Sequence, residues 1–197
     1  TQNLTESDLF IHNSENEAMT NWLKANKVEA KIVEISSENF KSDVVEVGES
    51  RFSKSDITIK GPHNHFNTSC AITAAKSCGI NESDISKGLK TFVNEPHRLE
   101  FIRTFKGVDY INDSKATNVD AVKYALLAME KPVIWVIGGT DKGNDYSEIK
   151  PLVKKRVKAM VCLGVDNSKL AAAFPDLYVN DQTARSAKAA VEIATNL

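Results

Sequence analysis

The sequence predicts an α/β protein: a Rossmann-like, mostly parallel sheet with helices on both faces, preceded by part of another α/β domain. From residue 96 onward, strand-like and helix-like segments alternate, which is the pattern of a parallel sheet with helical crossovers. One of these strands, over 132–137, is a continuous apolar run, as expected of a strand buried on both faces. The length of 197 residues fits one large domain or two small ones.

Composition excludes several classes of protein. Hydrophobic residues make up 42% and charged residues 26%, which is typical of a soluble globular chain and not of a disordered one. No apolar run approaches the ~18 residues that span a bilayer, so no membrane partner is expected. With 25 Lys and Arg against 26 Asp and Glu, the chain lacks the basic excess of a generic nucleic-acid binder.

The cysteines and the N-terminus point to a reducing compartment. Cys70, Cys78 and Cys162 form an odd set without CxxC spacing, which argues against a disulfide framework and against a zinc site. Cys70 and Cys162 have apolar neighbours and are expected to be buried and inert. Because no signal-like leader is present, a cytoplasmic location is expected. The chain starts at Thr1, so we expect either processing or a piece of a longer protein.

The first third predicts short strands with polar turns between them. β-Branched residues favour strands over 8–12, 30–35, 43–47 and 56–59, arranged as an irregular antiparallel edge. Ser14 and Glu17 resemble a capping box, which predicts a helix from there through Trp22 and Leu23.

Two helices follow and lead to the domain boundary. Small residues favour a helix over 66–78 that ends at Gly79. Apolar spacing predicts a second helix over 83–93. Pro96 ends this region, so the predicted domains are residues 1–95 and 96–197.

The second domain is predicted to start with a hairpin and continue as strand–helix alternation. Strands over 99–105 and 108–111 flank the tight turn Lys106-Gly107. The other strands are expected over 132–137, 159–163 and 177–179, and the helices over 119–129, 147–157, from 168 and from 183. No strand follows the last helix, so the sheet is expected to lack its final member.

Two polar clusters follow predicted strands, where ligands bind in open α/β sheets. Residues 112–118 lie between a strand and a helix N-terminus, a position suited to an anion; Lys115 adds a charge and Thr117 a hydroxyl. A simple capped turn fits this segment equally well. The Gly-rich turn 138–143 brings Lys142, but it is neither GxGxxG nor GxxxxGK[ST], and a solvated loop is the favoured interpretation.

A third cluster opens the helix near residue 66. Asn64 and Asn67 stand three apart and share one side of that helix, and paired amides can read the edge of a nucleobase. Ordinary N-capping is the favoured interpretation. His63 and His65 lack a third ligand at metal-site spacing, so no metal site is expected. Arg98 is either a clamp for a phosphate or carboxylate or a salt-bridge partner.

In their order along the chain, these segments resemble the C-terminal half of the Mur ligases. The resemblance rests on GPHNHFN at 61–67, PHRLE at 96–100, NDSKATN at 112–118 and the glycine pair at 138–139. The segment at 113–118 is similar to that of the members that add D-glutamate. The resemblance extends from about Gly61 to the end of the chain, and more loosely back to Thr1.

The resemblance implies an assignment of domains and site residues. Residues 1–95 would be the end of a central ATPase domain, and 96–197 most of the domain that delivers the amino acid. By this resemblance, Asn64 and Asn67 would contact the adenine of ATP, and Arg98, Asp113 and Lys115 would contact its ribose and phosphates. Arg98 and Lys115 would also be the catalytic cations. Thr117 and Lys142 would bind D-glutamate. Thr140 stands where the family often has an acidic residue, and it receives no role.

The implied reaction is ATP-dependent amide formation through an acyl phosphate, with UDP-N-acetylmuramoyl-L-alanine as acceptor. Mg²⁺ is the implied cofactor, and its ligands are expected mainly in the part of such a ligase that this sequence lacks. The sequence has no GxxxxGK[ST] segment and no counterpart of the family's carbamylated lysine or last strand, so the isolated chain is expected to be inactive. The side chains of Asn67, Lys115 and Lys142 are expected to converge in a cleft between the two halves.

Two other classes of function remain open. A non-catalytic α/β nucleotide-binding or interaction module would show an exposed apolar patch. A nicotinamide-dependent oxidoreductase needs a glycine-rich turn after its first strand, and Lys106-Gly107 is too poor for that.

Overall fold

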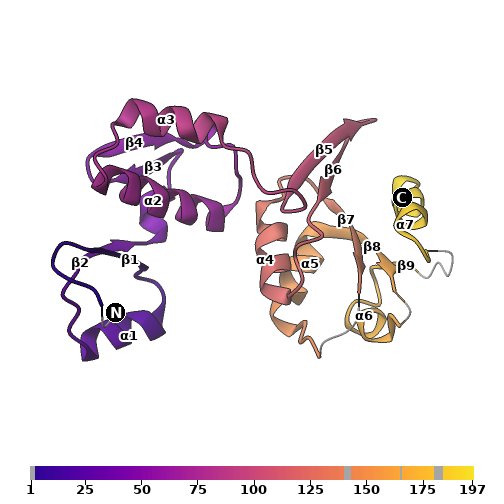
Figure 1. Ribbon diagram of the computed structural model, residues 1–197. Helices are drawn as coiled ribbons and strands as arrows, with labels where there is room; N and C mark the ends of the chain where they lie inside the picture. The colour runs from indigo at the N-terminus through magenta and orange to yellow at the C-terminus, as the bar shows by residue number, and fades with distance from the viewer. Residues whose placement is uncertain (1–2, 140–142, 165, 180–183) are drawn as a thin grey trace. The chain divides into compact units, whose positions relative to one another are not determined.

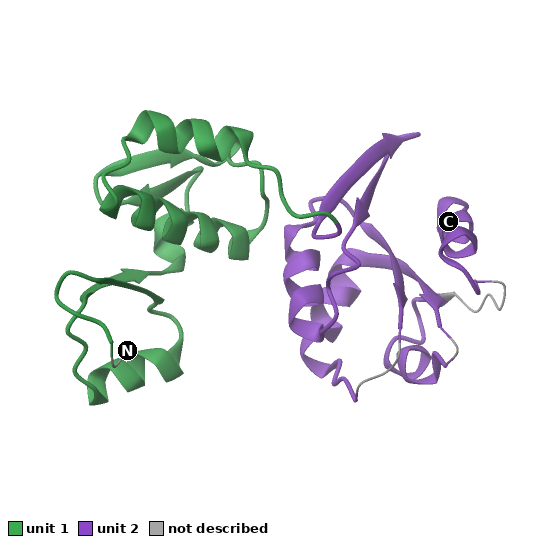
Figure 2. Ribbon diagram, viewed as in Figure 1, with its two compact units in different colours: residues 1–96 green, residues 97–197 purple. Residues whose placement is uncertain are grey.

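The computed structural model describes residues 3–139, 143–164, 166–179 and 184–197. The chain forms two compact units, Thr1–Pro96 and His97–Leu197 (Figure 2). Each unit has its own sheets and its own hydrophobic core.

Unit 1 begins with a parallel pair of strands. β1 (Leu9–Asn13) and β2 (Lys31–Ile35) run in the same direction, with α1 (Glu17–Ala25) between them in sequence. The predicted antiparallel arrangement is wrong for this pair, because the intervening helix returns the chain to the end from which β1 started. The cap of α1 is Asn16, whose Oδ1 accepts from the Met19 N–H over 2.9 Å. Ser14 instead donates its hydroxyl to the Ile35 carbonyl over 3.4 Å.

The next pair of strands is antiparallel and differs from the prediction in position. A short 3₁₀ turn, η1 (Ser37–Phe40), leads to β3 (Val44–Val47), which pairs with β4 (Ser50–Ser53). No strand forms over 56–59, where the 3₁₀ turn η2 (Lys54–Asp56) is followed by unpaired backbone. Ile57 is nevertheless part of the hydrophobic core, with 1% of its surface exposed, although its backbone pairs with no strand.

Two helices complete unit 1. α2 (Pro62–Ser77) begins at a proline, which suits the first helical turn, and its C-terminal Gly79 adopts a φ of 78°. α3 (Glu82–Thr91) packs beside it. The core of this unit consists of buried aliphatic and aromatic side chains: Val45, Val47, Phe52, Ile57, Ile72 and Ile85.

Unit 2 is built on a three-stranded parallel sheet in the order β7–β8–β9. The strands are β7 (Val133–Gly138), β8 (Val157–Leu163) and β9 (Tyr178–Val179). Crossovers through η3 (Ser147–Ile149) with α5 (Lys150–Arg156), and through α6 (Ser168–Ala173), join them. The predicted fold class is confirmed, although burial of β7 on both faces is incomplete, because Val136 is 39% exposed.

Helices cover both faces of this sheet, as Figure 1 shows. Side chains of α4 (Val119–Ala128), α5 and α6 share one core with Met160 and Cys162 of β8. The alternate residue Val161 faces α7 (Ala187–Thr195) and contacts Ala190 there. This alternation follows from the two-residue period of a strand.

A separate antiparallel hairpin opens unit 2. β5 (Glu100–Phe105) pairs with β6 (Val108–Asn112) around Lys106 and Gly107, whose φ values of 49° and 80° suit a two-residue hairpin turn. The pairing places Glu100 opposite Asn112, so the residues before β5 lie beside the loop after β6. Among the described residues, no helix is both long and apolar enough to cross a membrane.

Candidate functional site

The loop 112–118 connects β6 to α4. Asn118 caps the helix, because its Oδ1 accepts from the Ala121 N–H over 2.8 Å. A capped turn is therefore present, and the loop lies at the end of α4 where the unpaired N–H groups and the positive end of the helix dipole favour an anion.

Two hydrogen bonds tie this loop to the segment before β5. The Lys115 N–H donates to the His97 carbonyl over 3.0 Å, and the Leu99 N–H donates to Asp113 Oδ1 over 2.9 Å. Arg98, Asp113 and Lys115 are 15 and 2 residues apart along the chain, yet these bonds bring them into one local structure. Arg98 and Lys115 are exposed and Asp113 is partly buried.

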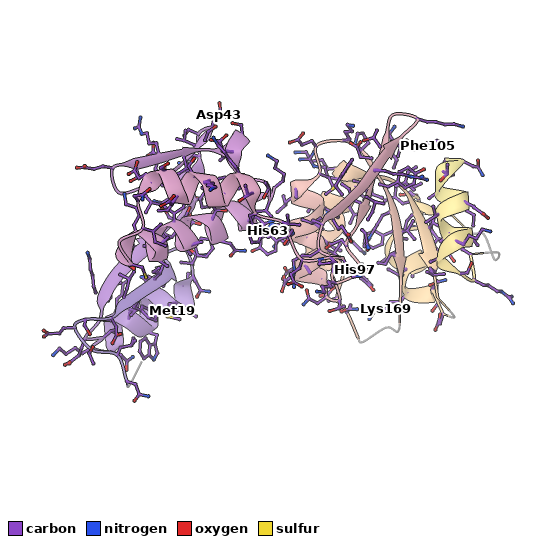
Figure 3. All side chains as sticks on the ribbon, turned by 45° about the horizontal axis from the view of Figure 1, so that its top comes forward. Met19, Asp43, His63, His97, Phe105 and Lys169 are labelled. Atoms are coloured by element: carbon purple, nitrogen blue, oxygen red, sulfur yellow. The ribbon has the colours of Figure 1, made fainter. Side chains whose placement is uncertain are left out.

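Three further side chains hold the same structure, and the sequence interpretation gave them no role. Asn112 Nδ2 lies 2.7 Å from His97 Nδ1 and 3.3 Å from Glu100 Oε2. The Glu100 carboxylate also accepts from the His97 N–H over 2.8 Å. His97 is labelled in Figure 3. The sequence did offer a signal for these contacts. His97 and Glu100 flank Arg98, and Asn112 directly follows the strand predicted to pair with the one that begins near Glu100.

Of the two residues predicted to bind D-glutamate, Thr117 and Lys142, the structure describes only Thr117. Thr117 is exposed and lies in the loop immediately before the cap of α4. Lys142 and Thr140 fall outside the described residues.

A hollow of about 230 Å³ lies at the start of α4, lined by Val119, Asp120, Asn144, Asp145 and Glu148. The Ser147 N–H, followed by its hydroxyl, lowers the pKa of Asp145, so this carboxylate is charged at neutral pH. A hollow with three carboxylate residues repels phosphate, and the cations that suit a phosphate are those of the Arg98 and Lys115 segments. The described part of the chain holds no group of three or more His, Cys, Asp and Glu that fits a metal ion.

Asn64 and Asn67 belong to unit 1, at the start of α2. The N-cap of α2 is Gly61, with no side-chain capping bond, so the favoured N-capping interpretation of these asparagines is wrong. Asn64 Nδ2 instead donates to the Lys60 carbonyl over 2.8 Å, while Asn67 is exposed. Because the two units are described separately, the convergence of Asn67 with Lys115 and Lys142 in one cleft stays a prediction.

His65, on the same helix turn, is a neutral side chain at pH 7. Burial lowers the pKa of His65 to about 4, with smaller contributions from the charges of Lys54, Lys60 and His63. Its ring lies 6.1 Å from that of Phe40. At the start of α2, the Asn64 and Asn67 amides are therefore accompanied by a neutral imidazole at His65 and not by a cation.

Comparison with known proteins decides the family. Residues 97–197 of the 197 match the family described as "Mur ligase, glutamate ligase domain". The chain belongs to the Mur ligase family. The resemblance stated from the sequence motifs is thereby confirmed, and the Arg98, Asp113 and Lys115 segments lie inside the matched region.

Curated relatives of this Mur ligase chain are similar over nearly all of it. The chain is 38% identical to the UDP-N-acetylmuramoylalanine–D-glutamate ligase of Cytophaga hutchinsonii, over 98% of this chain and 46% of that protein. It is 36% identical to the ligase of the same name from Christiangramia forsetii, over 100% of this chain and 46% of that protein. The chain therefore spans about half the length of these relatives.

Solved structures share the fold of this Mur ligase chain. Folylpolyglutamate synthase of Mycobacterium tuberculosis superposes with a TM-score of 0.68 at 16% identity, over 95% of this chain and 48% of that one. MurF of Acinetobacter baumannii gives a TM-score of 0.65 at 18% identity, over 88% and 42%. At these identities the likeness concerns the fold alone.

Proposed function

We propose that this chain forms part of an ATP-dependent ligase that joins D-glutamate to UDP-N-acetylmuramoyl-L-alanine. The observation that carries the proposal is the pairing of residues 97–99 with 113–115, which groups Arg98, Asp113 and Lys115 beside a helix N-terminus. The names of the relatives support the choice of amino acid and acceptor. Because ATP and nucleotide-linked precursors are its substrates, we place this ligase in the cytoplasm.

The proposed reaction has two steps. The alanine carboxylate oxygen of the acceptor attacks the γ-phosphorus of ATP, so that an acyl phosphate forms and ADP leaves. The amine of D-glutamate then attacks the acyl carbon, an amide bond forms, the nitrogen loses a proton and inorganic phosphate leaves. Both steps depend on positioning and on cations that stabilise charge on the phosphoryl oxygens.

The residues of this chain would serve the nucleotide in complementary ways. The planar guanidinium of Arg98 can bind two phosphate oxygens, and the Lys115 ammonium can act as a mobile point charge. The Asp113 carboxylate can accept from a ribose hydroxyl, while its Oδ1 is held by the Leu99 N–H at 2.9 Å. Asn64 and Asn67 can donate to and accept from the edge of adenine.

Thr117 and Lys142 would hold D-glutamate. A hydroxyl donates to a carboxylate and an ammonium pairs with it, and Thr117 lies one residue before the cap of α4. The expected Mg²⁺ does not fit a site in the described residues, which hold no suitable ligand cluster. No step is derived through the metal.

A nucleotide titration separates this proposal from the other candidate classes. We expect ADP, and not NADH, to raise the unfolding temperature of the chain, because only a bound ligand stabilises the folded state. Arg98→Ala should abolish the ADP shift, while Lys27→Ala, which changes an exposed cation of unit 1, should leave it intact. Stabilisation by NADH would favour an oxidoreductase, and no shift with either would favour an interaction module.

The catalytic part of the proposal is tested in a ligase of the relatives' full length. D-Glutamate-dependent release of phosphate from ATP should fall about 100-fold with Arg98→Ala, as expected when a charge-stabilising group is lost. Phosphate release that ignores D-glutamate would overturn the choice of substrate. The 197-residue chain alone should release none, since its sequence contains no GxxxxGK[ST] segment.

A further inference from the structure

The side chains of His97, Glu100 and Asn112, which we call the clasp, form a closed set of contacts at the base of the β5–β6 hairpin. Asn112 Nδ2 contacts both His97 Nδ1, at 2.7 Å, and Glu100 Oε2, at 3.3 Å. Glu100 Oε2 in turn accepts from the main-chain N–H of His97 over 2.8 Å and lies 3.6 Å from His97 Nδ1. Each member of the clasp therefore contacts the other two.

The direction of the hydrogen bonds in the clasp is determined by a neighbouring backbone group. The Ser114 N–H donates to Asn112 Oδ1 over 3.1 Å, which assigns the other end of the amide as the NH₂ group. An NH₂ group only donates, so His97 Nδ1 must accept and carries no hydrogen. The contact with Asn112 therefore favours the tautomer of His97 that carries its hydrogen on Nε2.

The clasp surrounds a backbone segment in an uncommon conformation. His97 and Leu99, on either side of Arg98, have φ values of 66° and 44°. Such values are uncommon for residues other than glycine and persist only when the surroundings impose them. The clasp supplies such contacts at His97, and the Leu99 N–H bond to Asp113 supplies one at Leu99.

The backbone conformation at His97 also orients its carbonyl, which accepts a hydrogen bond from the backbone of Lys115. The His97 carbonyl accepts from the Lys115 N–H over 3.0 Å, so the backbone angles at His97 determine where the Lys115 backbone lies. We propose that Asn112 is a positioning residue for the nucleotide. Acting through His97 and Glu100, it fixes the relative position of Arg98 and Lys115, and this inference rests on the proposed function of these two cations.

The direct test is the tautomer of His97 in the wild-type chain. Long-range ¹H–¹⁵N spectra should show a neutral ring protonated on Nε2 at pH 8, and Asn112→Leu should remove that fixed preference. A wild-type His97 protonated on Nδ1, or averaging between tautomers, would overturn the clasp irrespective of any ligand.

The functional test separates the KM values of the two substrates in the full-length ligase. Asn112→Leu should raise the KM for ATP about tenfold or more, because small displacements of positioning groups are costly, and should leave the KM for D-glutamate within about twofold. Asn26→Leu is the control, since the Asn26 amide also donates a hydrogen bond, to the Trp22 carbonyl at 2.8 Å, but in unit 1 and away from the clasp. A uniform loss of folded protein without a change in KM would instead assign the clasp to stability alone.

Two substitutions of His97 provide a rescue experiment. His97→Asn retains an acceptor oxygen and a residue that tolerates positive φ, so it should recover most of the ATP affinity lost in His97→Val. If Arg98→Ala leaves the KM for ATP unchanged, the proposed function of the cations fails. If Arg98→Ala raises it and Asn112→Leu does not, only the positioning role fails.

Discussion

Gly138 lies against the backbone of Leu163, its partner in the parallel ladder of β7 and β8. A Cβ atom on Gly138 would come within 1.7 Å of the Leu163 carbonyl oxygen and 2.6 Å of its carbonyl carbon. Because the obstacle is the backbone of the neighbouring strand β8, a rotamer change cannot relieve it. The end of β7 therefore requires a glycine for packing.

Gly138→Ala should destabilise unit 2 by about 3 kcal/mol or more, since overpacking that must displace backbone is at the upper end of such effects. Trp135 on β7 reports this unit, and a Trp22→Phe background removes the signal of unit 1. The midpoint of denaturant unfolding by fluorescence measures the change.

Gly88→Ala is the control for this substitution. A Cβ on Gly88 meets no atom within 4 Å, and Gly88 lies inside α3, so alanine should stabilise the chain by about 0.5–1 kcal/mol. Equal effects of the two substitutions would contradict the close approach of β7 and β8.

Cys162 should resist alkylation. Burial raises the pKa of its thiol to about 11, so at pH 8 only about one molecule in a thousand carries the reactive thiolate. Cys78 is exposed and serves as the internal comparison. Mass spectrometry after iodoacetamide treatment of the native chain should show Cys78 labelled well before Cys162; matching rates would show that Cys162 is accessible.

His65 should titrate far below an ordinary histidine. Its pKa falls from 6.5 to about 4 on folding, so the unfolded chain binds the extra proton between these values. Stability is therefore fully present above pH 6.5 and declines as the pH falls from 6.5 towards 4. His65→Gln should flatten this part of the stability profile, and a ring titrating near 6.5 in the folded chain by NMR would refute the prediction.

Substitutions in the two units should affect different substrates. In the full-length ligase, Asn67→Ala should raise the KM for ATP by about tenfold and spare D-glutamate, as expected for a lost hydrogen bond of about 1.5 kcal/mol. Lys142→Ala and Thr117→Ala should do the reverse, with the larger loss at the cation. Parallel losses of both substrates in all three variants would reject the assignment.

Local chemistry made the regular parts of this fold predictable. The apolar run of β7 and the Lys106-Gly107 turn specify their elements through side-chain periodicity and turn geometry. The prediction failed over 56–59, because Ile57 is buried by packing without any strand partner. The sequence analysis missed β4 because three of its four side chains, including the buried Ser50, are polar.

The candidate site was predictable only in part, for a different reason. Charged residues in the 98 and 113–115 segments could be recognised by type and position, but their grouping depends on hydrogen bonds to main-chain atoms. The bond from Lys115 to the His97 carbonyl uses no side chain of either residue. Such main-chain pairing leaves no mark in the residue types. The spacing of His97, Glu100 and Asn112 was the signal in the sequence, but their contacts became visible only in three dimensions.

The main-chain bonding of this segment has a consequence for how the chain can diverge. The Lys115 bond to His97 comes from an amide that every amino acid except proline possesses. The pairing of the two backbone segments can therefore persist while the side chain at position 115 is replaced. Chimaeras that keep Asn112 and Glu100 but carry other side chains at 98 and 115 would present new ligand chemistry on an inherited backbone.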